Sequence, residues 1–354
     1  MDIQKKDDPR LFGIIGSGSW ATAIVKILTD NKHRIQWLVR SEAVKEHILN
    51  RRHNPYYLST IFFDTELLAL STDISTVIQE SDTIIIATPS AFVASVMKPL
   101  TAADFKGKKI ISAVKGIIPE ENILLNDFLK KEYDVQSADY FTVMGPCHAE
   151  EVAAEKLSYL TFSGMDEPEA LQIAAHFETE YIRTIVNDDI YGVQFAAILK
   201  NIYALGAGIA HGLEYGDNFL SVLIANSADE MAGFLREVGI HNIQVGVHDG
   251  EDPVTHKKKS NYAASVYLGD LLVTCYSLYS RNRTFGNMIG KGYSVNAAKL
   301  ELNMVAEGYN ASKSIYLINK NVKSEMPIAE TIYKILWEQL SPAIGFKHIE
   351  ENLV

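Results

Sequence analysis

The sequence contains very little cysteine and no long uninterrupted apolar run. Cys147 and Cys275 are its only cysteines in 354 residues, which excludes a disulfide scaffold and fits a reducing compartment. No apolar run reaches the roughly 18 residues that a membrane-spanning helix needs. Residues 1–10 are polar and charged, unlike a signal peptide. We therefore expect a cytoplasmic protein that does not insert into a membrane.

Positive charge is also scarce. The chain has 33 Lys and Arg against 44 Asp and Glu, a net charge of -11 that repels nucleic acid and anionic membrane surfaces. Its hydrophobic content of 47% is that of an ordinary globular protein, and its length suits two domains. An acidic chain that handles an anionic substrate must concentrate its basic residues locally. The basic residues therefore indicate where to look for a site.

The first half of the chain alternates apolar runs with helical patterns. The runs lie at residues 11–15, 34–39, 82–87, 109–114 and 140–144, and residues 19–30 have the helical period. Val and Ile runs without polar alternation are typical of strands buried on both faces. This predicts an α/β fold, with a doubly wound, Rossmann-type sheet domain over residues 1–190. From residue 191 the apolar spacing is mostly 3 to 4, which predicts an all-helical domain over residues 191–354, interrupted by a polar loop at 242–260.

A glycine-rich turn follows the first predicted strand. Gly16, Gly18 and Ala21 form the pattern G-x-G-x-x-A, which permits a tight turn, close approach of a pyrophosphate and close packing of the next helix. Arg40 ends the second predicted strand, where an NAD-selective site usually has an acidic residue. A guanidinium there can pair with the 2′-phosphate of NADP, which favours NADPH. The nearby Glu42 means that NAD is also a possible cofactor. Arg40 could instead be solvated or stack on the adenine.

Basic and polar residues recur where ligands bind in such sheets. Lys115 follows a buried strand, and residues 144–151 read as strand, Gly-Pro and then helix. Lys200 and Asn201 lie inside a strongly apolar helical pattern. Burial would lower the pKa of Lys200 towards the working pH of a proton donor. The alternative is a lysine whose amine reaches the surface.

Two further segments supply possible partners for Lys200 and for a phosphate. Asp270 begins an apolar helical run and could pair with Lys200. Residues 280–283 read Ser-Arg-Asn-Arg, and arginine with asparagine is suited to a phosphate. Taken singly, each could also be a solvated pair or a helix cap. We expect no metal.

These segments together resemble the NAD(P)-dependent glycerol-3-phosphate dehydrogenase family over residues 12–333. The matching pieces are residues 16–20, 114–116, 145–146, 149–151, 199–201, 269–271, 274–275, 280–283, 285–286, 305–309 and 326–328. The resemblance implies reversible hydride transfer at C2, reducing dihydroxyacetone phosphate to sn-glycerol 3-phosphate with NADP or NAD. It also implies a homodimer that supplies glycerol phosphate for phospholipid synthesis.

The resemblance also implies roles for individual residues. Lys200 would be the proton donor in reduction, Asp270 would orient it, and Lys115 would contact both cofactor and substrate. Substrate would be bound by Lys115, Gly145, Cys147, Lys200, Asn201, Asp270, Ser280, Arg281 and Asn282. The cofactor would be bound by Gly16, Gly18, Ser19, Trp20, Arg40, Lys115, Ala149, Arg281, Val305 and Glu307.

The chain departs from the family pattern at two places. Cys147 stands where the family usually has Ser or Thr, so it is either a weaker substrate contact, an oxidation-sensitive thiol or a small space-filling residue. Residues 265–270 read Ser-Val-Tyr-Leu-Gly-Asp, where the family commonly reads Ala-Gly-Leu-Gly-Asp. The loop with Lys257, Lys258 and Lys259 either covers the site or is solvated.

Two other functions remain possible. One is a different two-domain hydroxyacid-type dehydrogenase acting on a small phosphorylated substrate, such as the 6-phosphogluconate type; the Arg281-Asn282 pair disfavours an acyl thioester. The other is a non-catalytic protein that senses a dinucleotide. That protein would be expected to lack Lys115, Lys200 or Asp270, and all of these are present.

Overall fold

The structure is a computed structural model that describes residues 10–241, 243, 245, 261–302 and 306–353. The chain forms two compact units. We call residues 1–114 and 123–190 the sheet unit, and residues 115–122 and 191–354 the helical unit. The short segment 115–122, which contains Lys115, thus belongs with the C-terminal helices although it lies in the first half of the sequence.

The sheet unit is built on one 8-stranded sheet with the order β3-β2-β1-β4-β5-β6-β7-β8. Neighbouring strands are parallel except β6 and β7, which are antiparallel. Phe12 of β1 lies opposite Ile35 of β2 and Thr83 of β4. The strands are β1 Phe12–Ile15, β2 Ile35–Leu38, β3 Leu68–Ser71, β4 Thr83–Ile86, β5 Lys109–Ser112, β6 Tyr140–Met144, β7 Ser158–Gly164 and β8 Ile182–Asn187.

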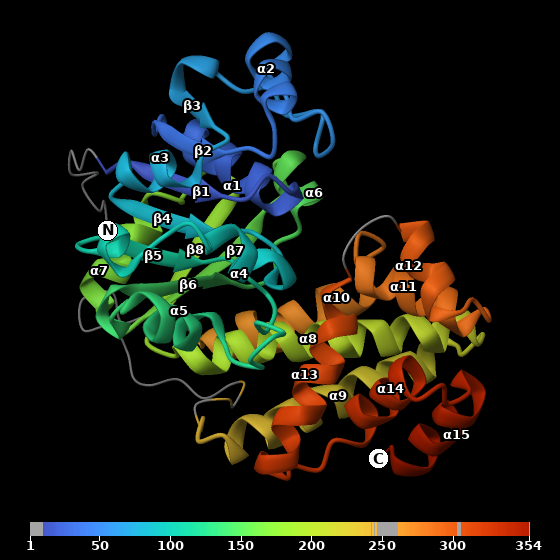
Figure 1. Cartoon of the computed structure of the whole chain (residues 1–354). Helices are drawn as coiled ribbons and strands as arrows, with labels where there is room; N and C mark the ends of the chain where they lie inside the picture. The colour runs from blue at the N-terminus through green and yellow to red at the C-terminus, as the bar shows by residue number, and fades with distance from the viewer. Residues whose placement is uncertain (1–9, 242, 244, 246–260, 303–305, 354) are drawn as a thin grey trace. The chain divides into compact units, whose positions relative to one another are not determined.

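Helices cover both faces of this sheet (Figure 1), so its central strands are buried on both sides. They are α1 Ser19–Asp30, α2 Glu42–Arg51, α3 Ile74–Gln79, α4 Ser90–Met97, α5 Leu125–Tyr133, α6 Ala149–Ala153 and α7 Glu167–Ala175. Local signals start some of them: the Asp73 carboxylate accepts hydrogen bonds from the N–H groups of Ser75 and Thr76 at the start of α3. Ile14, Ile85 and the other fully buried strand side chains each contribute about 1.5–3 kcal/mol by leaving water.

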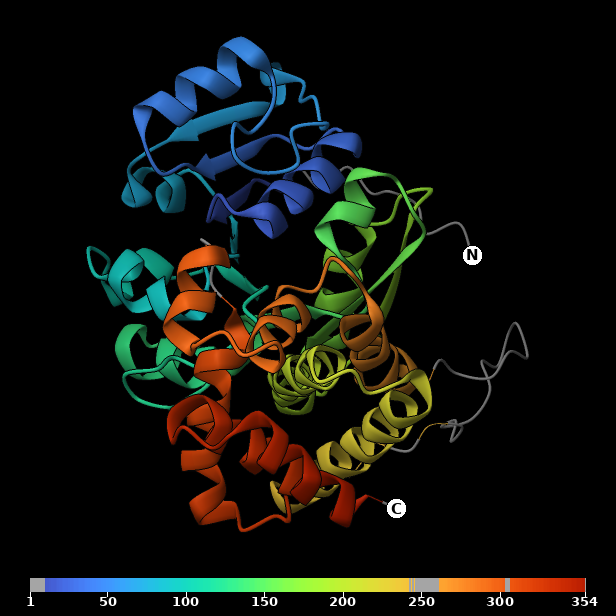
Figure 2. The ribbon, with the colours of Figure 1, turned by 90° about the vertical axis from the view of Figure 1, so that its right-hand side faces the viewer.

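The helical unit is arranged around the long helix α8, Ile190–Gly212, which Figure 2 shows among its neighbours. This helix is long and apolar enough to cross a membrane, but 94% of its apolar 18-residue stretch is buried inside the protein, so it is a core helix. The others are α9 Asp217–Glu237, α10 Asp270–Tyr276, α11 Arg281–Gly290, α12 Val295–Leu302, α13 Glu307–Val322, α14 Pro327–Trp337 and α15 Pro342–Asn352. A π-helical turn, Ala263–Gly269, leads directly into α10.

Helices α8 and α11 cross with their backbones in contact. A Cβ atom added to Gly286 of α11 would lie 2.0 Å from the carbonyl oxygen of Leu205, and one added to Gly208 of α8 would lie 2.1 Å from that of Arg283. Only glycine fits at such a crossing. The crossing holds the first turn of α11 near the middle of α8.

The structure confirms the predicted α/β fold class with a helical C-terminal region. Each predicted strand and the helix at residues 19–30 are present within a few residues of the expected bounds. Strands β3, β7 and β8 were not predicted, and the antiparallel β6–β7 pair is an exception to the expected parallel sheet. The polar loop expected at 242–260 lies, apart from residues 243 and 245, outside the described residues.

Candidate active site

The glycine-rich turn joins β1 to α1 in the sheet unit. Gly16 has φ +131°, and a Cβ atom there would lie 2.7 Å from the carbonyl oxygen of Ala87, so this position requires glycine. Gly18 is the N-cap of α1, and nothing lies within 4 Å of where its Cβ atom would be. Ala21 is fully buried against the sheet. An open turn at a helix N-terminus fits the phosphates of a dinucleotide.

Arg40 lies just beyond the end of β2, where it is exposed. Its guanidinium lies 5.7 Å from the centroid of the Tyr56 ring. The nearby Glu42 carboxylate accepts a hydrogen bond from Thr72 Oγ1 at 2.8 Å, and this bond is the main reason that its pKa is lowered. Lys45 lies 3.4 Å from the other carboxylate oxygen. The Glu42 carboxylate, which was the sequence feature compatible with an NAD-selective site, therefore contacts Thr72 and Lys45.

The Gly145-Pro146-Cys147 segment connects β6 to the short helix α6. Gly145 has φ +116°, and a Cβ atom there would lie 2.8 Å from the carbonyl oxygen of Tyr159. Cys147 is buried within the hydrophobic core of the sheet unit. This placement favours the space-filling interpretation of Cys147. Ala149, also buried, begins α6.

The helical unit contains a buried ion pair between Lys200 of α8 and Asp270 of α10. Lys200 Nζ donates to Asp270 Oδ1, and the two residues are only 4% and 2% exposed. The structure thus confirms the suggested pairing and excludes a lysine that reaches the surface. The second carboxylate oxygen, Asp270 Oδ2, is buried and has no hydrogen-bond partner among the described residues. It is available to a hydroxyl group of a ligand.

Burial is the largest influence on the Lys200 ammonium. It lowers the pKa of Lys200, and the nearby Lys115 lowers it further, whereas Asp270 raises it; the resulting pKa is about 8. Burial also raises the pKa of the neighbouring Cys275 thiol to about 12, so Cys275 remains neutral. A lysine with this pKa can both give and take a proton near neutral pH.

A chain of side-chain amides fixes the surroundings of Lys200. Asn201 Nδ2 donates to the carbonyl oxygen of Lys115 at 3.1 Å, and Asn282 Nδ2 donates to Asn201 Oδ1 at 2.9 Å. The N–H of Gly308 completes the chain by donating to Asn282 Oδ1 at 2.9 Å. These hydrogen-bonded amides connect segment 115–122, α8, α11 and α13. Two of them, Asn201 and Asn282, are residues that the family resemblance assigned to substrate binding.

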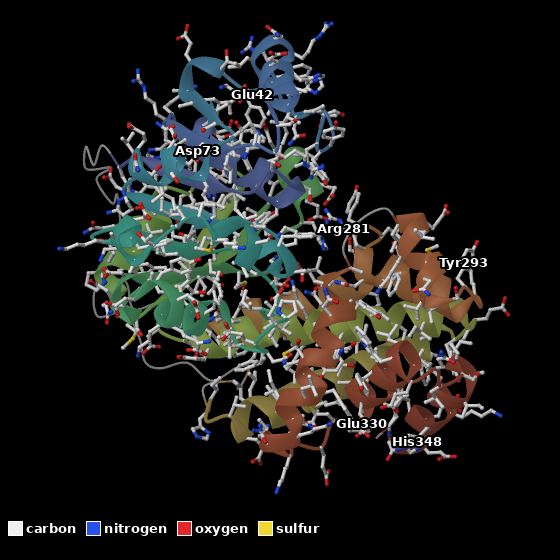
Figure 3. The ribbon with its side chains drawn as sticks, in the orientation of Figure 1. Glu42, Asp73, Arg281, Tyr293, Glu330 and His348 are labelled. Carbon is white, nitrogen blue, oxygen red and sulfur yellow. The ribbon has the colours of Figure 1, made fainter. Side chains whose placement is uncertain are left out.

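The start of α11 carries the arginine predicted to bind phosphate. The Ser280 hydroxyl caps this helix by accepting from the N–H of Arg283 at 3.3 Å. Arg281, labelled in Figure 3, is the first residue of α11 and is half-buried. It lies next in sequence to Asn282, which the amide chain anchors to the neighbour of Lys200.

The predicted site residues therefore divide between the two units. The helical unit contains Lys115, Lys200, Asn201, Asp270, Ser280, Arg281, Asn282 and Glu307, and the sheet unit contains Gly16, Gly18, Ser19, Trp20, Arg40, Gly145, Cys147 and Ala149. Val305 and Lys257–Lys259 lie outside the described residues. Within the described part of the chain, no three His, Cys, Asp or Glu residues are grouped as a metal site.

The sequence analysis assigned no role to three residues that hold site residues in place. Thr274 Oγ1 donates to the backbone carbonyl of Asp270 at 2.6 Å. In the sheet unit, Trp37 and Asn54 donate to the glycine-rich turn. A threonine one turn after a buried acid could have indicated the first contact. Nothing local in the sequence indicates the other two.

A doubly wound sheet with a glycine-rich turn, followed by a helical unit with a buried lysine–aspartate pair, defines a dinucleotide-dependent oxidoreductase. Comparison with known proteins is more specific. Residues 12–170 match the N-terminal model, and residues 189–347 the C-terminal model, of NAD-dependent glycerol-3-phosphate dehydrogenase. The chain belongs to the NAD-dependent glycerol-3-phosphate dehydrogenase family.

Individual relatives agree over nearly the whole chain. A glycerol-3-phosphate dehydrogenase [NAD(P)+] of a Thermoanaerobacter species is 34% identical over 93% of this chain and 93% of its own length. The enzyme of the same name from Enterococcus faecalis is 32% identical over 92% of this chain and 90% of its own. The crystal structure of glycerol-3-phosphate dehydrogenase from Coxiella burnetii is 25% identical, with a TM-score of 0.84, and covers 97% of this chain and 99% of that one.

Proposed function

We propose that this protein reduces dihydroxyacetone phosphate to sn-glycerol 3-phosphate, reversibly, with a reduced nicotinamide dinucleotide. The observation that carries the proposal is the buried Lys200–Asp270 pair, whose lysine has a pKa of about 8. Its support is the family membership, because the relatives that match most of the chain are named for this activity.

The bound nicotinamide would supply the hydride. Reduction places negative charge on the ketone oxygen at C2 of the substrate, and that oxygen needs a proton. Lys200 Nζ stabilises this charge and donates the proton, while Asp270 Oδ1 orients the amine. Asp270 Oδ2, without a partner among the described residues, can accept from a substrate hydroxyl. In the reverse direction neutral Lys200 removes the proton.

The substrate phosphate needs local positive charge in a chain with a net charge of -11. Arg281 supplies it at the N-terminal end of α11, where the helix dipole also favours an anion. Lys115 adds a second positive charge that acts on Lys200. Asn201 and Asn282 hold these groups in place, since their amides bond to one another and to the backbone.

We infer that NADPH is preferred to NADH. The turn at Gly16 and Gly18 would hold the phosphates common to both cofactors. The exposed Arg40 is suited to the 2′-phosphate, and the Glu42 carboxylate, which a free 2′-hydroxyl would need, bonds to Thr72. We further propose a cytoplasmic homodimer that supplies glycerol phosphate for phospholipid synthesis; light scattering on the purified protein tests the dimer.

The test is the loss of near-ultraviolet absorbance of NADPH, and separately of NADH, when dihydroxyacetone phosphate is added. A Lys200→Met variant is the matched control, because it keeps the length of the side chain without the amine. We expect turnover by the wild type with both cofactors, and a loss of about 10²- to 10⁴-fold in the variant. Turnover with 6-phosphogluconate or another phosphorylated hydroxyacid, and none with dihydroxyacetone phosphate, would favour the alternative dehydrogenase.

A further inference from the structure

The backbone of the glycine-rich turn is held from outside by side chains that no motif singled out. Trp37 Nε1, on β2, donates to the carbonyl oxygen of Gly16 at 2.7 Å. Asn54 Nδ2, from the segment after α2, donates to the carbonyl oxygen of Ser17 at 3.2 Å. Thr22 Oγ1 donates to the carbonyl oxygen of Gly18 at 2.8 Å. Each carbonyl oxygen of the turn therefore has a hydrogen-bond donor from the protein.

These bonds also decide where the N–H groups of the turn point. In a trans peptide the N–H of one residue points opposite to the carbonyl of the residue before it. Because the carbonyls of residues 16 to 18 are held by protein donors, each N–H of residues 17 to 19 is directed away from the donor that holds the preceding carbonyl. N–H groups at the start of a helix are where anions bind.

Asn54 is the residue that joins these contacts. It is only 1% exposed, and its amide also donates to Thr22 Oγ1 at 2.9 Å, the hydroxyl that holds Gly18. Its own oxygen, Oδ1, accepts from the N–H of Tyr56 at 3.0 Å. The ring of Tyr56 lies beneath Arg40. One buried amide thus connects the phosphate turn to the segment beside the proposed 2′-phosphate contact.

We propose that Asn54 is a positioning residue for cofactor binding, which presets the peptide planes of the glycine-rich turn for the pyrophosphate of NAD(P)H. The inference rests on the proposed use of a nicotinamide dinucleotide. Since NADH and NADPH share the pyrophosphate, Asn54 acts on the binding of both. Arg40, by contrast, acts on the 2′-phosphate that only NADPH has.

The experiment measures dissociation constants of NADH and NADPH by calorimetry, without substrate, for wild type, Asn54→Ala and a matched control. The control is Asn31→Ala, because Asn31 also donates two side-chain bonds to backbone carbonyls, of His176 and Glu178, at the other end of α1. We expect Asn54→Ala to weaken both cofactors by about tenfold, the effect of roughly 1.4 kcal/mol. Asn31→Ala should lower the melting temperature and leave both constants unchanged.

Kinetics separate positioning from a general structural role. With Asn54→Ala the KM for either cofactor should rise about tenfold, while kcat at saturating cofactor falls far less. A merely structural defect would instead lower the amount of active enzyme and leave the KM unchanged. Unchanged cofactor affinity in a folded Asn54→Ala protein, or equal weakening by Asn31→Ala, would overturn the proposal.

A second variant covers the case in which Asn54→Ala does not fold. Thr22→Val keeps the size of the side chain but removes the hydroxyl that joins Asn54 to Gly18, and it should weaken both cofactors several-fold. Affinity unchanged in this variant would also overturn the proposal. Because binding is measured without substrate, an enzyme that binds NADH but does not reduce dihydroxyacetone phosphate would contradict the proposed function and leave the role of Asn54 open to measurement.

Discussion

Replacing Asp270 by asparagine should make Lys200 a much weaker base. The substitution keeps the size of the side chain and one oxygen, removes the negative charge beside the ammonium, and replaces the other oxygen by an amide NH2 group. Burial and Lys115 both lower the pKa of Lys200, and Asp270 is the main group that opposes them. Without the carboxylate, the pKa of Lys200 should fall below its present value of about 8.

The size of this fall follows from the separation of the two charges. At an effective dielectric constant of about 20, opposite charges about 4 Å apart attract by about 4 kcal/mol. Since one pK unit corresponds to about 1.36 kcal/mol, the pKa should fall by about three. At about pH 7 the protonated fraction of Lys200 then drops from about nine in ten to about one in a hundred.

The two directions of the reaction should respond with opposite signs. Reduction needs protonated Lys200, so its kcat/KM falls as pH rises through the pKa of Lys200; oxidation needs neutral Lys200 and rises over the same range. In Asp270→Asn, reduction near neutral pH should be slower by about a hundredfold and should recover as the pH is lowered. Oxidation should lose its dependence on pH near neutrality.

The assay is the pH profile of kcat/KM in both directions, with melting curves to confirm that the variant is folded. Lys115→Met is a control of opposite sign, because the ammonium of Lys115 lowers the pKa of Lys200. Its removal should move the alkaline limb of the kcat/KM profile for reduction to higher pH. If the alkaline limb stays in place in Asp270→Asn, Lys200 is not the group that titrates, and the reasoning is refuted.

Three further substitutions test other parts of the molecule. Arg281→Ala should lower kcat/KM for dihydroxyacetone phosphate by one to two decades, the effect of losing about 1.5–3 kcal/mol of phosphate binding, and should spare unphosphorylated dihydroxyacetone; equal losses on both would contradict a phosphate contact. Arg40→Asp should raise the KM for NADPH and leave that for NADH almost unchanged, whereas an arginine that only stacks on adenine predicts equal losses. Gly286→Ala should lower the melting temperature by several degrees, because its Cβ atom would lie 2.0 Å from a carbonyl oxygen of α8. Gly233→Ala, with 3.8 Å to its nearest neighbour, is the control and should not destabilise the protein.

The sheet could be predicted where its strands are mostly apolar. Residues 83–86 and 140–144 contain one threonine each among apolar residues, and both strands are buried throughout. Strand β7 was missed because it buries Ser158, Thr161 and Ser163 between its apolar residues. Strand β3 was missed for a different reason, since it lies at the sheet edge and is partly exposed. Neither strand has the pattern that defined the others.

The candidate site could be predicted in part for a similar reason. A lysine inside an apolar helix needs a partner, so the Lys200–Asp270 pair followed from the chemistry of burial. The amide chain from Asn201 to Asn282 and Gly308 did not, because it depends on how α8, α11 and α13 pack. The contacts of Trp37 and Asn54 with the glycine-rich turn likewise depend on tertiary packing, and no local sequence pattern indicates either contact.

The assignment of residues 115–122 to the helical unit has a consequence for dividing the gene. The chain leaves the sheet unit after Val114, returns to it after Asn122, and leaves again after Ile190. A gene fragment starting at residue 191 would therefore encode Lys200 and Asp270 without Lys115, whose carbonyl Asn201 contacts and whose ammonium lowers the pKa of Lys200. Two separately expressed halves cut at residue 190 would have to reassociate before the lysine had its full set of neighbours, so gene fusion or domain exchange with a relative should carry residues 115–122 along with the C-terminal half.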